Sequence, residues 1–149
     1  MPIAIFAMLL FGICTWLGAG TVEAVMRDFA NEVGMPTWVF VAIPGLLAML
    51  FSFPLYHNAA RRITNLRESM TRGILVAIAT WLGIATMISY MWCPASRTLH
   101  CTSDVLMVTG IIGGGPLLVA TLVAGFVVGT LVLRRVDWLT YERPAARVE

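Results

Sequence analysis

The sequence predicts an all-α integral membrane protein, a bundle of four transmembrane helices with a short amphipathic helix on the extracytoplasmic side. Of its 149 residues, 59 % are hydrophobic and 12 % are charged, whereas a soluble domain averages roughly 45–50 % apolar and about 25 % charged residues. The charges lie in blocks between four charge-free stretches, at residues 2–20, 37–56, 73–92 and 105–133. Each stretch is long enough to cross a bilayer, so we expect one membrane domain followed by a cytoplasmic tail at 134–149.

The first apolar stretch, residues 2–20, is predicted to be a membrane span. As a helix it is about 29 Å long, close to the thickness of a hydrocarbon core. A cleaved signal peptide is the alternative, with the small residues at 18–20 as its end. Signal peptides begin with a basic segment and have a shorter apolar core, and the first basic residue here is Arg27. The pattern therefore favours a retained helix.

The connector after the first stretch has the pattern of a surface helix. Its apolar residues recur at helical spacing and form one stripe, which comprises Val22, Val25, Met26, Phe29 and Val33. Thr21 is a candidate cap at its start, and Gly34 followed by Pro36 marks its end. We expect about three turns of helix lying on the outer surface. The helix is either a plain connector or a lid or docking surface, and the stripe alone does not distinguish these roles.

The second stretch, 37–56, contains Pro44 and Gly45 near its middle. Proline removes a backbone donor and crowds the preceding turn, so a kink near Ile43 is expected. The third stretch, 73–92, contains no helix breaker of this kind and is predicted to be an ordinary span.

Arginine placement predicts the orientation of the chain. The connector between the second and third stretches and the C-terminal tail hold eight arginines: Arg61, Arg62, Arg67, Arg72, Arg134, Arg135, Arg143 and Arg147. The other two connectors hold one each, Arg27 and Arg97. Basic residues accumulate on the cytoplasmic side. We therefore expect a multi-pass protein of the cell (inner) membrane with a basic cytoplasmic connector and with both termini in the cytoplasm.

Two cysteines in the second outer connector predict a disulfide. Cys93 and Cys101 are eight positions apart in a short loop on the oxidising side, where thiols pair readily. A structural bond is the favoured interpretation, and a redox-active pair is the alternative. A redox relay needs a second pair, and the remaining cysteine, Cys14, lies alone in the first stretch. A metal site is not predicted, because His100 adds only a third ligand.

The fourth stretch, 105–133, is too long for a simple upright span and has a weak centre. Its helix-breaking or close-packing candidates are Gly110, Gly113, Gly114, Gly115, Pro116, Gly125 and Gly129. We expect an interruption at 113–116, because each glycine costs about 1 kcal/mol of helix propensity and proline about 3. Either the part before Pro116 projects outward, or the whole stretch is one tilted helix with its glycines at membrane depth. The second outcome is favoured, because 105–112 is strongly apolar.

Several kinds of chemistry are disfavoured by composition. No Asp, Glu, Lys, Arg or His lies within the four stretches, whereas ion-coupled carriers usually keep such a group at depth. His57 and His100 lie at opposite membrane faces, about 30 Å apart, so they cannot share one haem. The net charge of +2 is too small to indicate nucleic-acid binding. We expect no cofactor and no metal.

Three functions fit this pattern. The favoured one is an accessory or interaction subunit whose partners are the bilayer and other membrane-protein subunits, or a second copy of itself. The alternative is a small transporter or channel built as a homo-oligomer. The third is an enzyme or thiol-redox protein at the outer face, with acid–base candidates Glu23, Asp28, Glu32, His100 and Asp104. No spacing joins these five residues into a catalytic set, so an enzyme is disfavoured.

Overall fold

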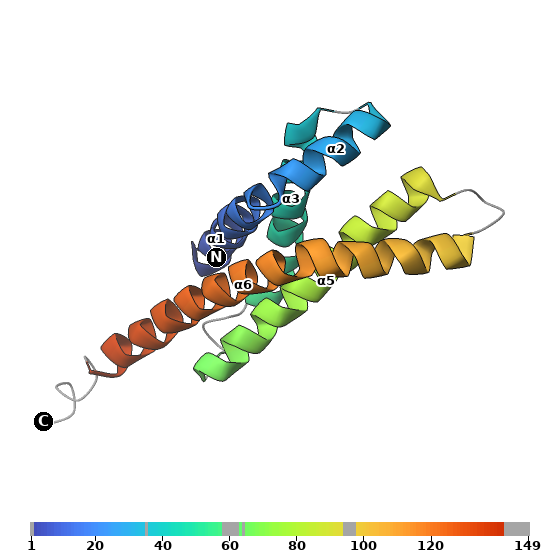
Figure 1. Cartoon of the computed structure of the whole chain (residues 1–149). Helices are drawn as coiled ribbons and strands as arrows, with labels where there is room; N and C mark the ends of the chain where they lie inside the picture. Colours follow the sequence, from blue (N-terminus) through green and yellow to red (C-terminus); the bar gives the residue numbers. More distant parts are fainter. Residues whose placement is uncertain (1, 35, 58–62, 64, 94–97, 142–149) are drawn as a thin grey trace, which may run out of the picture.

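The computed structural model describes residues 2–34, 36–57, 63, 65–93 and 98–141, and Figure 1 shows how their helices are arranged. In chain order the helices are α1 (Pro2–Gly20), α2 (Glu23–Val33), α3 (Thr37–Tyr56), α5 (Leu66–Trp92) and α6 (Thr98–Tyr141). The all-α prediction is confirmed for these residues, which contain no strand. Four of the helices, α1, α3, α5 and α6, are long and apolar enough to cross a membrane.

Helix α5 is longer than the apolar stretch that predicted it. It begins at Leu66, directly after Asn65, whose backbone is extended. Arg67 and Arg72 therefore lie in the first two turns of α5, and their assignment to a connector was wrong. Hydropathy misses these turns because they are polar, although a Glu68–Arg72 ion pair at helical spacing stabilises them. Arg61 and Arg62 lie outside the described residues.

Helix α6 is continuous, and the interruption expected at 113–116 is absent. The helix runs for 44 residues with Pro116 inside it, a length of about 66 Å or twice a hydrocarbon core. Contacts on either side of the weak centre explain why it stays helical, because Gly110 lies against Trp81 of α5 and Pro116 lies against Gly18 of α1. Such contacts routinely outweigh intrinsic propensity. The outcome matches the single long helix rather than the outward projection.

The helices pair through close contacts at glycine. A Cβ added to Gly45 of α3 would lie 3.1 Å from the Gly12 carbonyl oxygen of α1. A Cβ added to Gly73 of α5 would lie 2.7 Å from the Thr121 carbonyl oxygen of α6. Each glycine thus lets two backbones approach more closely than any side chain would allow, which is how helices associate in membranes.

The predicted surface helix is present as α2, between α1 and α3 in Figure 1. Gly34 ends it in the left-handed conformation at φ 72°, as the sequence indicated. The expected cap by Thr21 was wrong, because the Thr21 hydroxyl donates to the Gly18 carbonyl at 2.7 Å and extends the end of α1 instead. Glu23 and Arg27 form an exposed ion pair at 3.1 Å.

Candidate functional site: an apolar cavity at the disulfide end

One end of the bundle is closed by buried hydrogen bonds, and we call it the basic end. It comprises the end of α3, the start of α5 and the part of α6 after Thr121. The buried Tyr56 hydroxyl donates to the Ser69 carbonyl at 2.8 Å, and the Ser69 hydroxyl donates to the Gly125 carbonyl at 2.7 Å. These bonds join α3 to α5 and α5 to α6. They satisfy polar groups where water is excluded.

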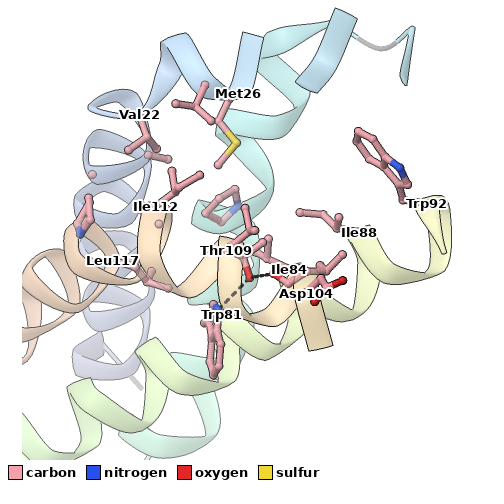
Figure 2. A pocket seen from close by; sticks show the side chains of 18 of the residues that line it. Val22, Met26, Trp81, Ile84, Ile88, Trp92, Asp104, Thr109, Ile112 and Leu117 are labelled. Carbon is pink, nitrogen blue, oxygen red and sulfur yellow. Dashed lines mark hydrogen bonds between the residues drawn. The ribbon is translucent and has the colours of Figure 1, made fainter. Parts of the chain in front are cut away.

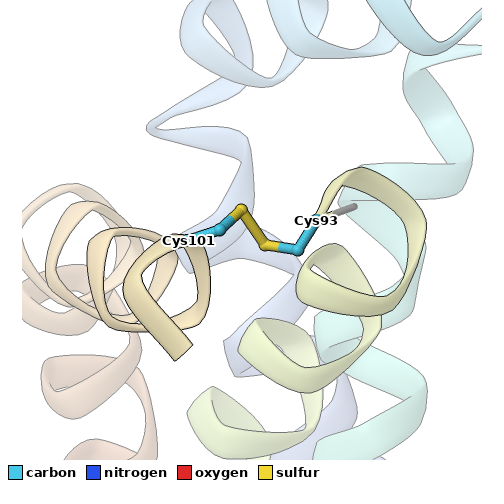
Figure 3. Close-up of a disulfide and its surroundings, with 2 residues drawn as sticks. All are labelled: Cys93 and Cys101. Carbon is cyan, nitrogen blue, oxygen red and sulfur yellow. A yellow bond between two sulfur atoms is a disulfide. The ribbon is translucent and has the colours of Figure 1, made fainter. Parts of the chain in front are cut away.

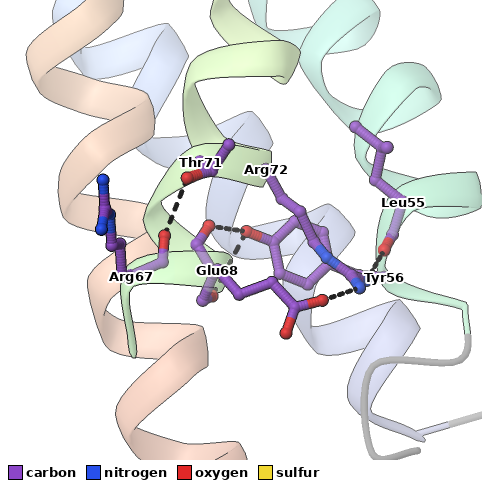
Figure 4. A network of polar contacts seen from close by, with 7 residues as sticks. Leu55, Tyr56, Arg67, Glu68, Thr71 and Arg72 are labelled. Carbon is purple, nitrogen blue, oxygen red and sulfur yellow. Dashed lines mark hydrogen bonds and ion pairs between the residues drawn. The ribbon is translucent and has the colours of Figure 1, made fainter. Parts of the chain in front are cut away.

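Arg72 adds a second link at the basic end, shown in Figure 4. Its guanidinium donates to the Leu55 carbonyl at 2.6 Å and to the Glu68 carboxylate at 2.7 Å. Only 14 % of the Arg72 side chain is exposed. Arginine presents several donors in a fixed plane, which suits it to satisfying a helix-end carbonyl and a carboxylate together. Arg72 therefore fixes the end of α3 to the start of α5.

The other end of the bundle, which we call the disulfide end, is hollow. It comprises α2, the end of α1 from Thr15, α5 from Trp81, and α6 up to Leu117, together with Pro44 of α3. These elements enclose a cavity of about 610 Å³. Its lining is predominantly apolar, and Figure 2 shows most of the side chains that form it. Ligand sites in proteins typically have about 300–1,000 Å³ and this kind of lining.

The cavity begins where α6 leaves α1. A Cβ added to Gly18 of α1 would meet the Pro116 carbonyl oxygen and the Ala120 side chain, both at 3.2 Å, so the two helices touch there. Toward its N-terminus α6 instead stays beside α5, because the Trp81 indole nitrogen donates to the Thr109 hydroxyl at 3.1 Å. The space on the side of α6 facing α1 is thus left open.

Helix α2 covers part of this space. Val22, Val25 and Met26 from its predicted apolar stripe line the cavity, and Figure 2 shows Val22 and Met26 reaching toward it. The backbone of Phe29 and Val33 is helical, but their side chains lie outside the described residues. The part of the stripe formed by Val22, Val25 and Met26 therefore faces the cavity.

The three central glycines of α6 are not packing points within the chain. A Cβ added to Gly113, Gly114 or Gly115 would have no neighbour within 4 Å. Gly113 lines the cavity, whereas Gly114 and Gly115 do not. By contrast, a Cβ added to Gly125 would lie 3.1 Å from the Ser69 carbonyl oxygen of α5, and a Cβ added to Gly129 would lie 2.8 Å from the Ser69 Cβ.

The predicted disulfide is present at the rim. Cys93 and Cys101 are bonded, with their Cα atoms 5.7 Å apart, and Figure 3 shows the bond joining the end of α5 to the start of α6. Cys101 also lines the cavity. Cys14 is free and half-buried, as expected. The bond thus holds together the two helices whose separation from α1 creates the space.

The polar groups that line the cavity differ in hydrogen bonding and in exposure. The Thr109 hydroxyl accepts from Trp81 and donates to the Val105 carbonyl at 2.7 Å, so this pair is satisfied. The hydroxyl of Thr15, a residue only 1 % exposed, has no partner among the described residues. His100 and Asp104 are exposed and lie one helical turn apart at the rim.

The acid–base candidates are not brought together. His100 and Asp104 share the cavity rim, but Glu23, Asp28 and Glu32 lie on α2 and do not line the cavity. No group of three potential metal ligands occurs among the described residues. Proton transfer needs an acid and a base placed around one reacting atom, and His100 and Asp104 are the two of these five candidates that lie together at the cavity.

Sequence reasoning missed the cavity and two polar links. Trp81 and Thr109 are far apart in sequence and lie in predicted spans, where both read as ordinary apolar-helix residues. The sequence around Ser69 and Tyr56 did not predict the hydrogen bond between them either. A buried tyrosine usually finds a partner for its hydroxyl, so Tyr56 was the one residue that could have indicated a polar link at the end of α3.

No protein-family model, no curated protein and no solved structure matches this chain.

Proposed function

We propose that this chain is a multi-pass protein of the cell (inner) membrane that holds a small apolar guest in its disulfide end and acts by binding rather than by catalysis. The observation that supports the proposal is the cavity of about 610 Å³ in a bundle whose opposite end is joined by buried hydrogen bonds. Unfilled apolar space of this size forfeits packing energy. A guest from the bilayer restores those contacts.

A pore through one chain is disfavoured, because the cavity lining stops at Pro116 and Leu117 and the helices beyond them are in close contact at Gly125 and Gly129.

The test uses Gly113, which lines the cavity and has free space around it. Gly113→Leu should fill part of the cavity without a clash. Gly115→Leu is the matched control, because Gly115 lies on the same helix, also has free space, and does not line the cavity. We expect native mass spectrometry of the chain in mild detergent to show a retained small apolar molecule in the wild type and in Gly115→Leu, and its loss in Gly113→Leu. Equal retention in both variants contradicts the proposal.

Orientation is proposed from the arginine distribution and is tested by labelling. Cysteines placed at Asn65 and Thr140 should be shielded from an impermeant thiol reagent in intact cells, and one at Asn31 should react. Labelling at position 65 from outside overturns the proposed topology.

An accessory subunit of a larger membrane assembly is the second candidate. The observation that favours it is the free space around Gly114 and Gly115, where an added Cβ would meet none of the described residues within 4 Å. Three glycines in a helix lower its stability, and a partner's backbone could pack closely against them. Alanine at positions 113, 114 and 115 together should leave the fold intact and should abolish a stoichiometric association with another protein. Unchanged association removes this candidate, and a homo-oligomer recovered alone points to self-assembly instead.

A further inference from the structure

The lining of the cavity is sorted by polarity from its inner part to its rim. The inner part is formed by apolar side chains and by Trp81 and Thr109, whose polar atoms are bonded to each other. The rim carries His100 and Asp104, both exposed and on one face of α6. A guest that matches this pattern has an apolar tail and a polar head.

The depth of the cavity matches one leaflet of a bilayer. Along α5 the lining extends from Trp81 to Trp92, a rise of about 16 Å. Half of a hydrocarbon core is about 15 Å. With Trp92 and Asp104 near the membrane surface, a tail of one outer-leaflet amphiphile fits the cavity while its head stays at the rim.

The charge of the disulfide end selects among possible heads. The segments 21–36 and 93–104 at this end hold four acids, Glu23, Asp28, Glu32 and Asp104, and two bases, Arg27 and Arg97, so acids are in excess. Arg27 is bonded to Glu23, and Arg97 lies outside the described residues. A phosphate head at the rim would therefore meet unfavourable charge, whereas a cationic head is attracted and a hydroxyl head can donate to Asp104.

We infer that the cavity binds a single-chain amphiphile with a cationic or hydroxyl head, its tail beside Trp81 and Ile84 and its head at His100 and Asp104. The inference rests on the proposed function and adds the chemical class of the guest. Helix α2 covers the tail through Val22 and Met26. The disulfide fixes the rim, because Cys101 lies one residue from His100 and three from Asp104.

The experiment compares three dodecyl probes that differ only in the head: dodecyltrimethylammonium, dodecanol and dodecyl phosphate. Native mass spectrometry of the delipidated chain in a neutral detergent measures the binding of each. We expect the trimethylammonium probe to bind about two- to five-fold more tightly than the phosphate probe, the range for one exposed charge interaction. The preference should shrink at high salt. Asp104→Asn should remove most of it, and Asp28→Asn, which changes an exposed acid outside the cavity, should leave it in place.

The outcomes separate this inference from the proposed function. If the probes bind with no preference, or if the phosphate probe binds best, the inference is wrong and the cavity still binds apolar guests. If Asp28→Asn and Asp104→Asn change the preference equally, the head does not lie at the rim and the inference also fails. If none of the probes binds, or if Gly113→Leu binds them as well as the wild type does, the proposed function itself fails.

Discussion

Glycines of α6 have opposite roles at the two ends of the bundle. At the basic end, Gly125 and Gly129 of α6 bring its backbone against Ser69 of α5. At the disulfide end, a Cβ added to Gly113, Gly114 or Gly115 of the same helix would meet none of the described residues within 4 Å. The basic end links its helices by buried hydrogen bonds, and the disulfide end links α5 to α6 by a covalent bond at the rim.

The difference shows that the structural effect of a glycine in an apolar helix depends on whether another helix crosses at that position. Where two helices cross, glycine permits contact and substitution is costly. Where they diverge, glycine leaves space and substitution is cheap. We therefore expect contacts at the basic end to provide most of the stability of the fold. The open space at the disulfide end is expected to cost little stability.

The largest expected effect comes from Gly73→Ala at the basic end. Its Cβ would lie 2.7 Å from the Thr121 carbonyl oxygen, so α5 and α6 must separate. We expect a loss of about 2–3 kcal/mol, the upper part of the range for overpacking, measured by unfolding in detergent. The control is Gly20→Ala, because a Cβ at Gly20 has no neighbour within 4 Å. A Gly73→Ala variant as stable as the wild type would show that the helices are not in close contact.

Removal of the disulfide should have the next largest effect and should act locally. The double variant Cys93→Ser/Cys101→Ser is expected to lose about 2 kcal/mol, since the bond closes a short loop. Hydrogen exchange should increase at the end of α5 and the start of α6. It should not change around Tyr56 and Ser69. Cys14→Ser is the control, because this thiol is free. Faster exchange at both ends alike would contradict the separation of the two regions.

Ser69→Ala tests the hydrogen bonds of the basic end. It removes the donor to the Gly125 carbonyl on another helix, and we expect a loss of about 1 kcal/mol in the unfolding equilibrium. Ser52→Ala is a matched control, because Ser52 is equally buried but its hydroxyl donates to Met49 on its own helix. Equal effects of the two variants would mean that the bond between helices adds nothing.

The smallest expected effect has the opposite sign. Gly114→Ala adds a side chain where there is free space, and alanine favours the helix by up to about 1 kcal/mol relative to glycine in water. We expect a slightly raised unfolding midpoint for the isolated chain. A clear loss of stability would show that a neighbour approaches Gly114 in solution.

Much of the fold follows from local patterns, and the cavity does not. Hydropathy places the helices because a span needs an unbroken apolar run, and Gly34 ends α2 because few other residues adopt its backbone conformation. Local patterns do not extend to the polar start of α5, where Arg72 reaches Leu55 across to α3. They also misjudged 113–116, because propensity counts the cost of glycine and proline but not the contacts that hold α6 on either side of this segment, at Gly110 and Pro116.

The candidate site depends on contacts between distant parts of the chain. Whether Gly113 faces a helix or a cavity depends on where α6 crosses α1, at Gly18 and Pro116. The hydrogen bond from Trp81 to Thr109 joins the part of α6 before that crossing to α5. Nothing in the spacing of these residues along the sequence encodes their distance in space. The disulfide was predictable because its two cysteines are close in sequence and in one loop.

Hydrogen exchange of the chain in lipid nanodiscs, with and without dodecyltrimethylammonium, tests the central claim most directly. The account predicts that the added amphiphile slows exchange in α2 and in the first turns of α6, which surround the cavity. The start of α5 and the part of α6 after Thr121 should already be protected and should not change. Protection that is absent, or that spreads equally over both ends, would contradict a binding cavity confined to the disulfide end.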